Sequence, residues 1–147
     1  MGGSTLNLQI STEMVAIDAD EWDALAGQKN PFVSHAFLTA LETGGAVGGN
    51  SGWSAMHLLL RSENGQLLGA MPHYLKHHSY GEYIFDHSWA NVFERAGGTY
   101  YPKLLGAIPF TPATGPRLLV RDGRRDHKEA LARGALRLLD EYQLSSA

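Results

Sequence analysis

Two apolar segments joined by a tight turn constrain the fold of this chain more than any other feature. The segments 56–61 (MHLLLR) and 67–75 (LLGAMPHYL) enclose an Asn64-Gly65 pair, which is a strong short-range signal for a β-hairpin. An antiparallel pair of strands is therefore predicted here. Pro72 lies within the second segment and cannot donate a ladder hydrogen bond, so it predicts a bulge or a sheet edge at that point.

Three other segments begin with residues that commonly cap helices. Asp18 is followed three residues later by Glu21 in a capping box, and Asp126 is followed by Glu129 in the same way. Ser34 is the third predicted cap. The last of these helices should pack one apolar stripe against a sheet. The stripe consists of Leu131, Ala135, Leu138 and Tyr142.

Shorter signals complete the element order. Strands are also predicted at 6–10, 104–108 and 118–120, a glycine-rich loop at 46–52, and a short helix from Trp89 to Ala96. The resulting order is β, α, α, β, β, a short helix, β, β, α. It predicts an α/β (α+β) chain with a mixed, largely antiparallel sheet flanked by helices.

The domain organisation follows from this order. We expect residues 6–147 to form a single domain or the N-terminal part of one, and residues 1–5 (MGGST) to be linker-like. The chain stops just after an amphipathic helix, which needs a sheet face to cover. We therefore expect an incomplete sheet that is satisfied either by a missing C-terminal part of the same chain or by a second copy in a homo-oligomer.

Composition narrows the classes of function. The net charge is −3 and the sequence contains no cysteine, so a basic footprint for duplex nucleic acid is absent and disulfides and thiolate metal sites are excluded. No apolar run approaches the roughly 20 residues that span a bilayer. The N-terminus lacks the features of a secretory signal, so a cytoplasmic location is the default expectation.

Several blocks of the sequence are long and unusual in composition. They are NPFVSHAFLTALE, GAMPHYLKHHSYGEYIFDHSWANVFERAG, YYPKLLGAIPFTPATGPRLL and LLDEYQLSSA. In these blocks the chain, from about residue 14 to 147, resembles the bacterial FemAB-like proteins, which are related to peptidoglycan biosynthesis and placed in the GNAT (acyl-CoA N-acyltransferase) superfamily. The resemblance implies a GNAT-like fold and transfer of an acyl or aminoacyl group to an amine. It also implies a small-molecule or cell-wall-precursor substrate, with acyl-CoA as a candidate donor.

The stretch from His77 to Leu104 interleaves aromatic and ionisable side chains. Transfer of an acyl group to an amine needs a base and a donor to the tetrahedral oxyanion. The catalytic candidates in this stretch are Tyr80, Glu82 and Asp86. The substrate-binding candidates are Lys76, Tyr83, Tyr100, Tyr101 and Lys103. The alternative is that the tyrosines are half-buried with local partners and that Phe85, Trp89 and Phe93 are core residues.

A second candidate site is the loop VRDGRRDHKEAL, which runs from a strand through a glycine into a helix. Such a junction offers backbone N–H groups and a positive helix end to phosphate. Arg121, Gly123, Arg124 and Arg125 are the cofactor-binding candidates. The loop has one glycine where the GNAT pattern has two small residues, and Asp122 and Asp126 oppose an anion. A solvated turn with ordinary surface arginines is the alternative.

No metal site is expected. His73 and His77 are four residues apart, but on a strand that spacing separates them by roughly 13 Å. No His-Glu-x-x-His signature occurs. His57, alone in an apolar strand, is interpreted as a structural residue with a satisfied hydrogen bond. The competing hypothesis for the whole chain is a non-catalytic binding or oligomerisation domain on the same scaffold.

Overall fold

The computed structural model describes residues 5–78, 91–92, 94–97, 101–109 and 115–144. Its strands are β1 (Asn7–Ser11), β2 (Trp53–Ala55), β3 (His57–Arg61), β4 (Leu67–Met71), β5 (Tyr74–Lys76), β6 (Lys103–Leu105) and β7 (Leu119–Val120). Its α-helices are α1 (Ala19–Ala26), α2 (His35–Thr43) and α4 (Arg125–Glu141), with 3-10 turns η1 (Met14–Ala16), η2 (Pro31–Val33) and η3 (Arg121–Gly123). The predicted α+β class is confirmed.

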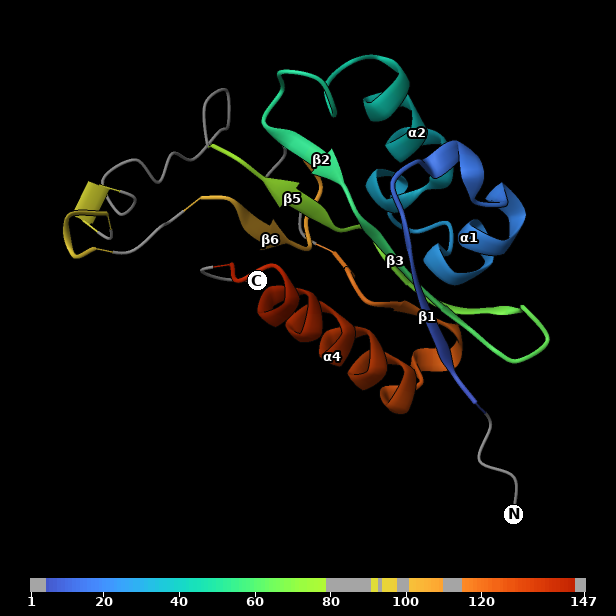
Figure 1. Cartoon of the computed structure of the whole chain (residues 1–147). Coiled ribbons are helices and arrows are strands. Elements are labelled where there is room, and N and C mark those ends of the chain that lie inside the picture. Colours follow the sequence, from blue (N-terminus) through green and yellow to red (C-terminus); the bar gives the residue numbers. More distant parts are fainter. Residues whose placement is uncertain (1–4, 79–90, 93, 98–100, 110–114, 145–147) are drawn as a thin grey trace.

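The strands form two antiparallel sheets. The first has the order β1-β3-β4-β7 and the second has the order β2-β5-β6. Helices α1 and α2 cover one face of the first sheet, and α4 covers the opposite face (Figure 1). Alternate residues of β3 divide between the two layers. Leu59 joins the core beneath α1 and α2, whereas Leu58 and Leu60 join the core beneath α4.

The predicted hairpin is present, and it extends further than expected. β3 and β4 pair around a turn in which Gly65 adopts φ +84°, a conformation that glycine accepts without strain. The segment 67–75 is interrupted at Pro72 as predicted, but the interruption goes further than a bulge and divides the segment into β4 and β5, which belong to different sheets. The partner strand bends at the same level. Met56 separates β2 from β3 and donates its N–H to His73 O at 2.8 Å, so one two-stranded ribbon runs through both sheets.

The predicted N-caps are present for the first two helices and absent for the third, but Glu21 does not complete the capping box at Asp18, because its carboxylate accepts from Leu67 N at 3.1 Å. The Asp18 carboxylate accepts from Glu21 N at 2.9 Å, and Ser34 Oγ accepts from Phe37 N at 3.2 Å. α4 begins instead at Arg125, and its N-cap residue is Arg124, with no side-chain cap. The predicted cap Asp126 lies inside the first turn, because its carboxylate binds the Arg124 guanidinium through two hydrogen bonds of 2.7 and 3.0 Å.

Three smaller expectations also need correction. Glu129 does not complete a capping box, because its carboxylate accepts from Arg125 Nε at 2.9 Å. Tyr142, predicted on the buried stripe of α4, is 55% exposed, while Leu131, Ala135 and Leu138 are buried as expected. The predicted strand 104–108 is shorter than expected and spans Lys103–Leu105.

β1 is an edge strand that lies over α4. It pairs only with β3 among the described strands, and its apolar residues Leu8 and Ile10, with Leu6 just before it, are 38%, 43% and 37% exposed. A Cβ built on Gly134 of α4 would fall 2.2 Å from Leu8 Cδ2. The absence of a side chain at this glycine therefore allows the helix and the strand to approach closely.

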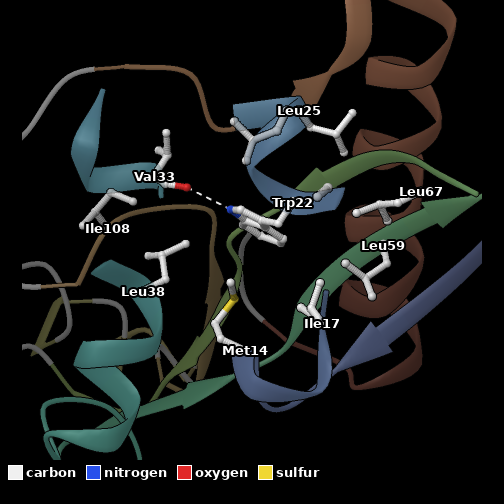
Figure 2. Close-up of a cluster of buried hydrophobic side chains, with 11 residues drawn as sticks. Met14, Ile17, Trp22, Leu25, Val33, Leu38, Leu59, Leu67 and Ile108 are labelled. Atoms are coloured by element: carbon white, nitrogen blue, oxygen red, sulfur yellow. Dashed lines mark hydrogen bonds between the residues drawn. The ribbon is translucent and has the colours of Figure 1, made fainter. Parts of the chain in front are cut away.

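The main core lies between α1, α2 and the first sheet (Figure 2). Trp22 is fully buried in it, and its indole Nε1 donates to Val33 O at 2.9 Å. This hydrogen bond ties α1 to η2, while the ring packs in the same cluster as Met14, Leu38 and Leu59.

We expect Trp22→Phe to lower the free energy of unfolding by about 1–3 kcal/mol, because it leaves the Val33 carbonyl without its donor and opens a void. Urea unfolding followed by circular dichroism measures this change. Val15→Ala is the control, since Val15 is 64% exposed and should change stability by less than about 0.5 kcal/mol. Equal effects of the two substitutions would contradict the assignment of Trp22 as the central core residue.

Candidate functional site

A buried polar cluster lies where the ribbon passes from one sheet to the other. Its centre is Glu42, in the last turn of α2. Oε1 of Glu42 accepts from Met14 N at 2.9 Å, and Oε2 is 3.0 Å from His57 Nε2. The Glu42 side chain is 14% exposed, and that of His57 is fully buried. A carboxylate in such surroundings needs hydrogen-bond donors, and the fold supplies two.

Backbone contacts fix the tautomer of His57. The N–H of His73 approaches His57 Nδ1 at 3.4 Å, and a backbone N–H can only donate. Nδ1 therefore accepts, and the proton of a neutral His57 lies on Nε2, from which it is donated to Glu42. The imidazole is thus held at both nitrogens and serves to fix the Glu42 carboxylate in one orientation.

His73 extends the cluster. It is buried, and its Nδ1 lies 3.3 Å from Met56 O, so Nδ1 carries the proton and donates to this carbonyl. Burial lowers the pKa of His73 to about 4, with the hydrogen bond to Met56 acting in the opposite direction and the charge of His57 adding to the decrease. His73 is therefore neutral at physiological pH.

Tyr74 completes this region and is fully buried. Its ring meets the rings of His57 and Trp53 edge to face, at centroid distances of 5.1 and 5.5 Å. Within the described part of the chain, the Tyr74 hydroxyl has no hydrogen-bond partner. Burial, and to a lesser extent the nearby Glu42 carboxylate, raise the pKa of Tyr74 above its ordinary value.

An open pocket adjoins Glu42. It has a volume of about 250 Å³. Its walls are apolar at Val15, Val47 and Ala55. The polar lining comes from Thr12, Glu13, Glu42, Thr43 and Gly48. None of these lining residues is basic, so the pocket favours a cation over an anion.

The predicted residues of the aromatic stretch lie only partly within the described structure. Lys76 and Lys103 occupy paired positions on β5 and β6. Lys76 is buried with its Nζ 5.6 Å from the Trp53 ring centroid, and Lys103 Nζ lies 5.4 Å from that of Tyr101. The second sheet therefore brings together Lys76, Tyr101 and Lys103. The predicted residues Tyr80, Glu82, Tyr83, Asp86 and Tyr100 lie outside the described residues, as do Phe85, Trp89 and Phe93.

The predicted phosphate loop is η3 and the start of α4. Asp122 and Gly123 both adopt positive φ, at 54° and 64°. Arg121, Gly123, Arg124 and Arg125 are exposed. Arg124 is ion-paired with Asp126 at 2.7 Å, and the Arg124 guanidinium lowers the pKa of that carboxyl to about 2.

A second pocket adjoins this helix start, and Arg124 lines it together with Leu6, Ser62, Leu68, Asp126 and His127. His127 is buried, and its Nδ1 has no hydrogen-bond partner among the described residues. Of the predicted arginines Arg124 lines the pocket, and Asp126 and Glu129 already neutralise part of the charge of Arg124 and Arg125.

The described part of the chain contains neither a metal-binding group nor a membrane-spanning helix. No group of three or more side chains there could hold a metal ion. No helix there is both long and apolar enough to cross a membrane.

Comparison with known proteins assigns the chain to a family. Residues 13–147 match the family model for FemAB-like proteins, described as peptidoglycan biosynthesis/recognition. The chain belongs to the FemAB-like family. No curated protein and no solved structure matched the chain. The predicted FemAB-like membership is confirmed, and with it a function related to peptidoglycan, whereas placement in the GNAT superfamily stays a prediction.

In this FemAB-like chain, sequence reasoning missed Glu42 as the centre of the buried cluster. The interpretation of His57 as a satisfied structural residue agrees with its contacts. Its partner Glu42 lies 15 residues away and on a different element, and nothing in the local pattern of α2 separates Glu42 from a surface glutamate. A buried histidine in an apolar strand was the only available signal that a polar partner had to exist.

We expect the FemAB-like domain to lose stability as the pH falls from about 6.5 towards 4. His73 binds its proton in the unfolded state at an ordinary pKa near 6.5, but in the folded state only at about 4. The unfolded state therefore holds more protons in this window, and stability falls by up to about 1.4 kcal/mol per pH unit.

Urea unfolding at several pH values tests this expectation. His73→Gln should reduce the pH slope, and His77→Gln, which changes an exposed histidine, should retain the wild-type slope. An unchanged slope in His73→Gln would contradict the account.

We also expect Tyr74→Phe to raise the free energy of unfolding by about 1 kcal/mol. The substitution removes a buried hydroxyl that the described structure leaves without a partner and keeps the ring contacts. Thermal unfolding measures the change. A loss of stability would show that this hydroxyl is in fact satisfied.

Proposed function

We propose that this chain is a GNAT-like N-acyltransferase that moves an acyl or aminoacyl group to an amine on a cell-wall precursor in the cytoplasm. Membership of a family described as peptidoglycan biosynthesis/recognition supports the substrate class. The observation that carries the transferase proposal is the junction of β7, η3 and α4. There a strand turns through two left-handed residues into the uncapped N-terminus of a 17-residue helix, beside a pocket.

This junction is suited to the phosphate groups of an acyl donor. The first N–H groups of a helix lack intrahelical acceptors and carry partial positive charge, so they attract anions. Arg124 lines the pocket, and Arg121 and Arg125 lie close to Arg124 in the sequence. An arriving phosphate can compete with Asp126 for the Arg124 guanidinium, because that ion pair is exposed to solvent and therefore contributes little. Acyl-CoA is the proposed donor.

The chemical step needs a base for the acceptor amine and hydrogen-bond donors for the oxyanion that forms on the acyl carbonyl. The amine nitrogen attacks this carbonyl, and the thiol or hydroxyl of the donor leaves with a proton. Glu82 or Asp86 is proposed as the base and Tyr80 as a donor. Lys76, Tyr83, Tyr100, Tyr101 and Lys103 are proposed to hold the acceptor.

We expect isothermal titration calorimetry to detect binding of acetyl-CoA, and Arg124→Ala to weaken it about tenfold through loss of a charged hydrogen-bond donor. Asp126→Asn should tighten binding, because it removes a competing carboxylate and a negative charge. Arg137→Ala is the matched control, since Arg137 is an exposed arginine near the other end of the same helix. Identical affinities for all four proteins would contradict a donor site at this junction.

One observation favours a second candidate, a binding domain without turnover. The family description includes recognition as well as biosynthesis, and Arg124 and Arg125 are both ion-paired already. One assay distinguishes the two candidates. The chain is incubated with acyl donors and soluble cell-wall precursors, and the mass of the precursor is then measured by mass spectrometry. A mass gain of one acyl or aminoacyl group supports the transferase. Thermal stabilisation by a precursor without any mass gain supports the binding domain.

A further inference from the structure

The pocket beside Glu42 is distinct from the proposed donor site. The donor site adjoins the start of α4, and Glu42 belongs to α2, and these helices cover opposite faces of the first sheet (Figure 1). A ligand group bound at Glu42 therefore lies away from a donor bound at α4.

The Glu42 carboxylate retains capacity for another donor. A carboxylate has about four lone-pair positions, and here one oxygen accepts from Met14 N and the other from His57 Nε2. Both of these donors are rigid, because one is backbone and the other is a fully buried ring. The carboxylate lines the pocket in a fixed orientation, so a bound cation would not have to order it first.

The electrostatics of the pocket favour positive charge from two further sources. Glu13 adds a second carboxylate to the lining. The pocket also lies at the C-terminal end of α2, where Thr43 is the last helical residue and the helix dipole is negative. Among the lining residues there is no lysine, arginine or histidine to neutralise this charge.

The shape and the remaining walls define the kind of cation. At about 250 Å³ the pocket takes a side-chain-sized group. Val15, Val47 and Ala55 offer apolar contact to a short alkyl chain, and the hydroxyl of Thr12 can accept a hydrogen bond. An alkylammonium group matches this combination, because it carries three N–H donors at the end of an aliphatic stem.

We infer that the Glu42 pocket binds a primary ammonium group on a short aliphatic chain. The site is an anchor for a ligand rather than a part of the acyl-transfer chemistry, and it does not depend on the chain being a transferase. Glu42 supplies the charge, His57 and Met14 hold it in place, and the wall of Val15, Val47 and Ala55 selects the alkyl stem.

The test uses n-pentylamine as the probe and 1-pentanol as its neutral counterpart, added to the whole chain at constant ionic strength. Two-dimensional amide NMR should show shifts centred on Thr43, Val47, Gly48 and Ala55 with the amine, and at least tenfold weaker binding of the alcohol. Equal binding of the two compounds, shifts centred elsewhere, or no saturable shift with the amine would overturn the inference.

Two variants distinguish the effect of the pocket's charge on binding from an effect of disturbed folding. Glu42→Gln should weaken amine binding at least tenfold, but it also disturbs the partners of Met14 and His57. Thr43→Arg leaves these contacts intact and places a cation at the pocket, on an exposed helix end that favours positive charge. It should abolish amine binding, whereas Thr43→Gln, of similar length but neutral, should retain it.

Unchanged amine binding in Thr43→Arg would overturn the site, whatever the stability of Glu42→Gln. The acyl-transfer assay is read separately with the same variants. Amine binding without any transfer would argue against the proposed function and leave the anchor in place.

Discussion

The bend in the ribbon at Met56 and Pro72 is the constraint on which the rest of the structure depends. Four of the seven described strands belong to this ribbon, and each sheet receives one pair of them. At the bend the ladder continues only through the hydrogen bond from Met56 N to His73 O. The rings of His57 and His73 satisfy two backbone groups at this bend. His57 Nδ1 accepts from the N–H of His73, and His73 Nδ1 donates to Met56 O, so neither backbone group is left buried without a partner.

Glu42 connects this bend to the helical layer. Through His57 it contacts β3, and through the N–H of Met14 it holds η1, which leads from β1 into α1. His35, about two helical turns before Glu42 on the same face of α2, contacts the same segment, because its Nε2 lies 2.8 Å from both Met14 O and Ile17 O. The turn between β1 and α1 is therefore fixed at both of its ends by side chains of α2, which positions the walls of the Glu42 pocket.

The parts of this fold that could be predicted from the sequence are those set by neighbours in the chain. The caps at Asp18 and Ser34 and the Asn64-Gly65 turn depend on residues within four positions, and all three are as predicted. The predicted cap at Asp126 does not form. Both oxygens of its carboxylate accept hydrogen bonds from Arg124 instead of from a backbone N–H, and the capping pattern does not include this competing partner. The division of the strand at Pro72 depends on pairing with short, distant strands such as β6, whose three residues show no usable periodicity.

The first sheet, which is built by long-range strand pairing, separates the two charged regions of the chain. The arginine-rich start of α4 and the acidic end of α2 lie on opposite faces of one sheet, so an anionic group and a cationic group can bind without competing for the same space (Figure 1). The two ends of β1 adjoin these two regions, since Leu6, just before the strand, lines the α4 pocket and Thr12, just after it, lines the Glu42 pocket. This strand contains no charged residue and keeps one free edge among the described strands, features that other sheet proteins usually avoid at an edge. The predicted homo-oligomer stays a prediction. A partner that covered this edge would restrict access to both pockets, because the residues that flank β1 line them.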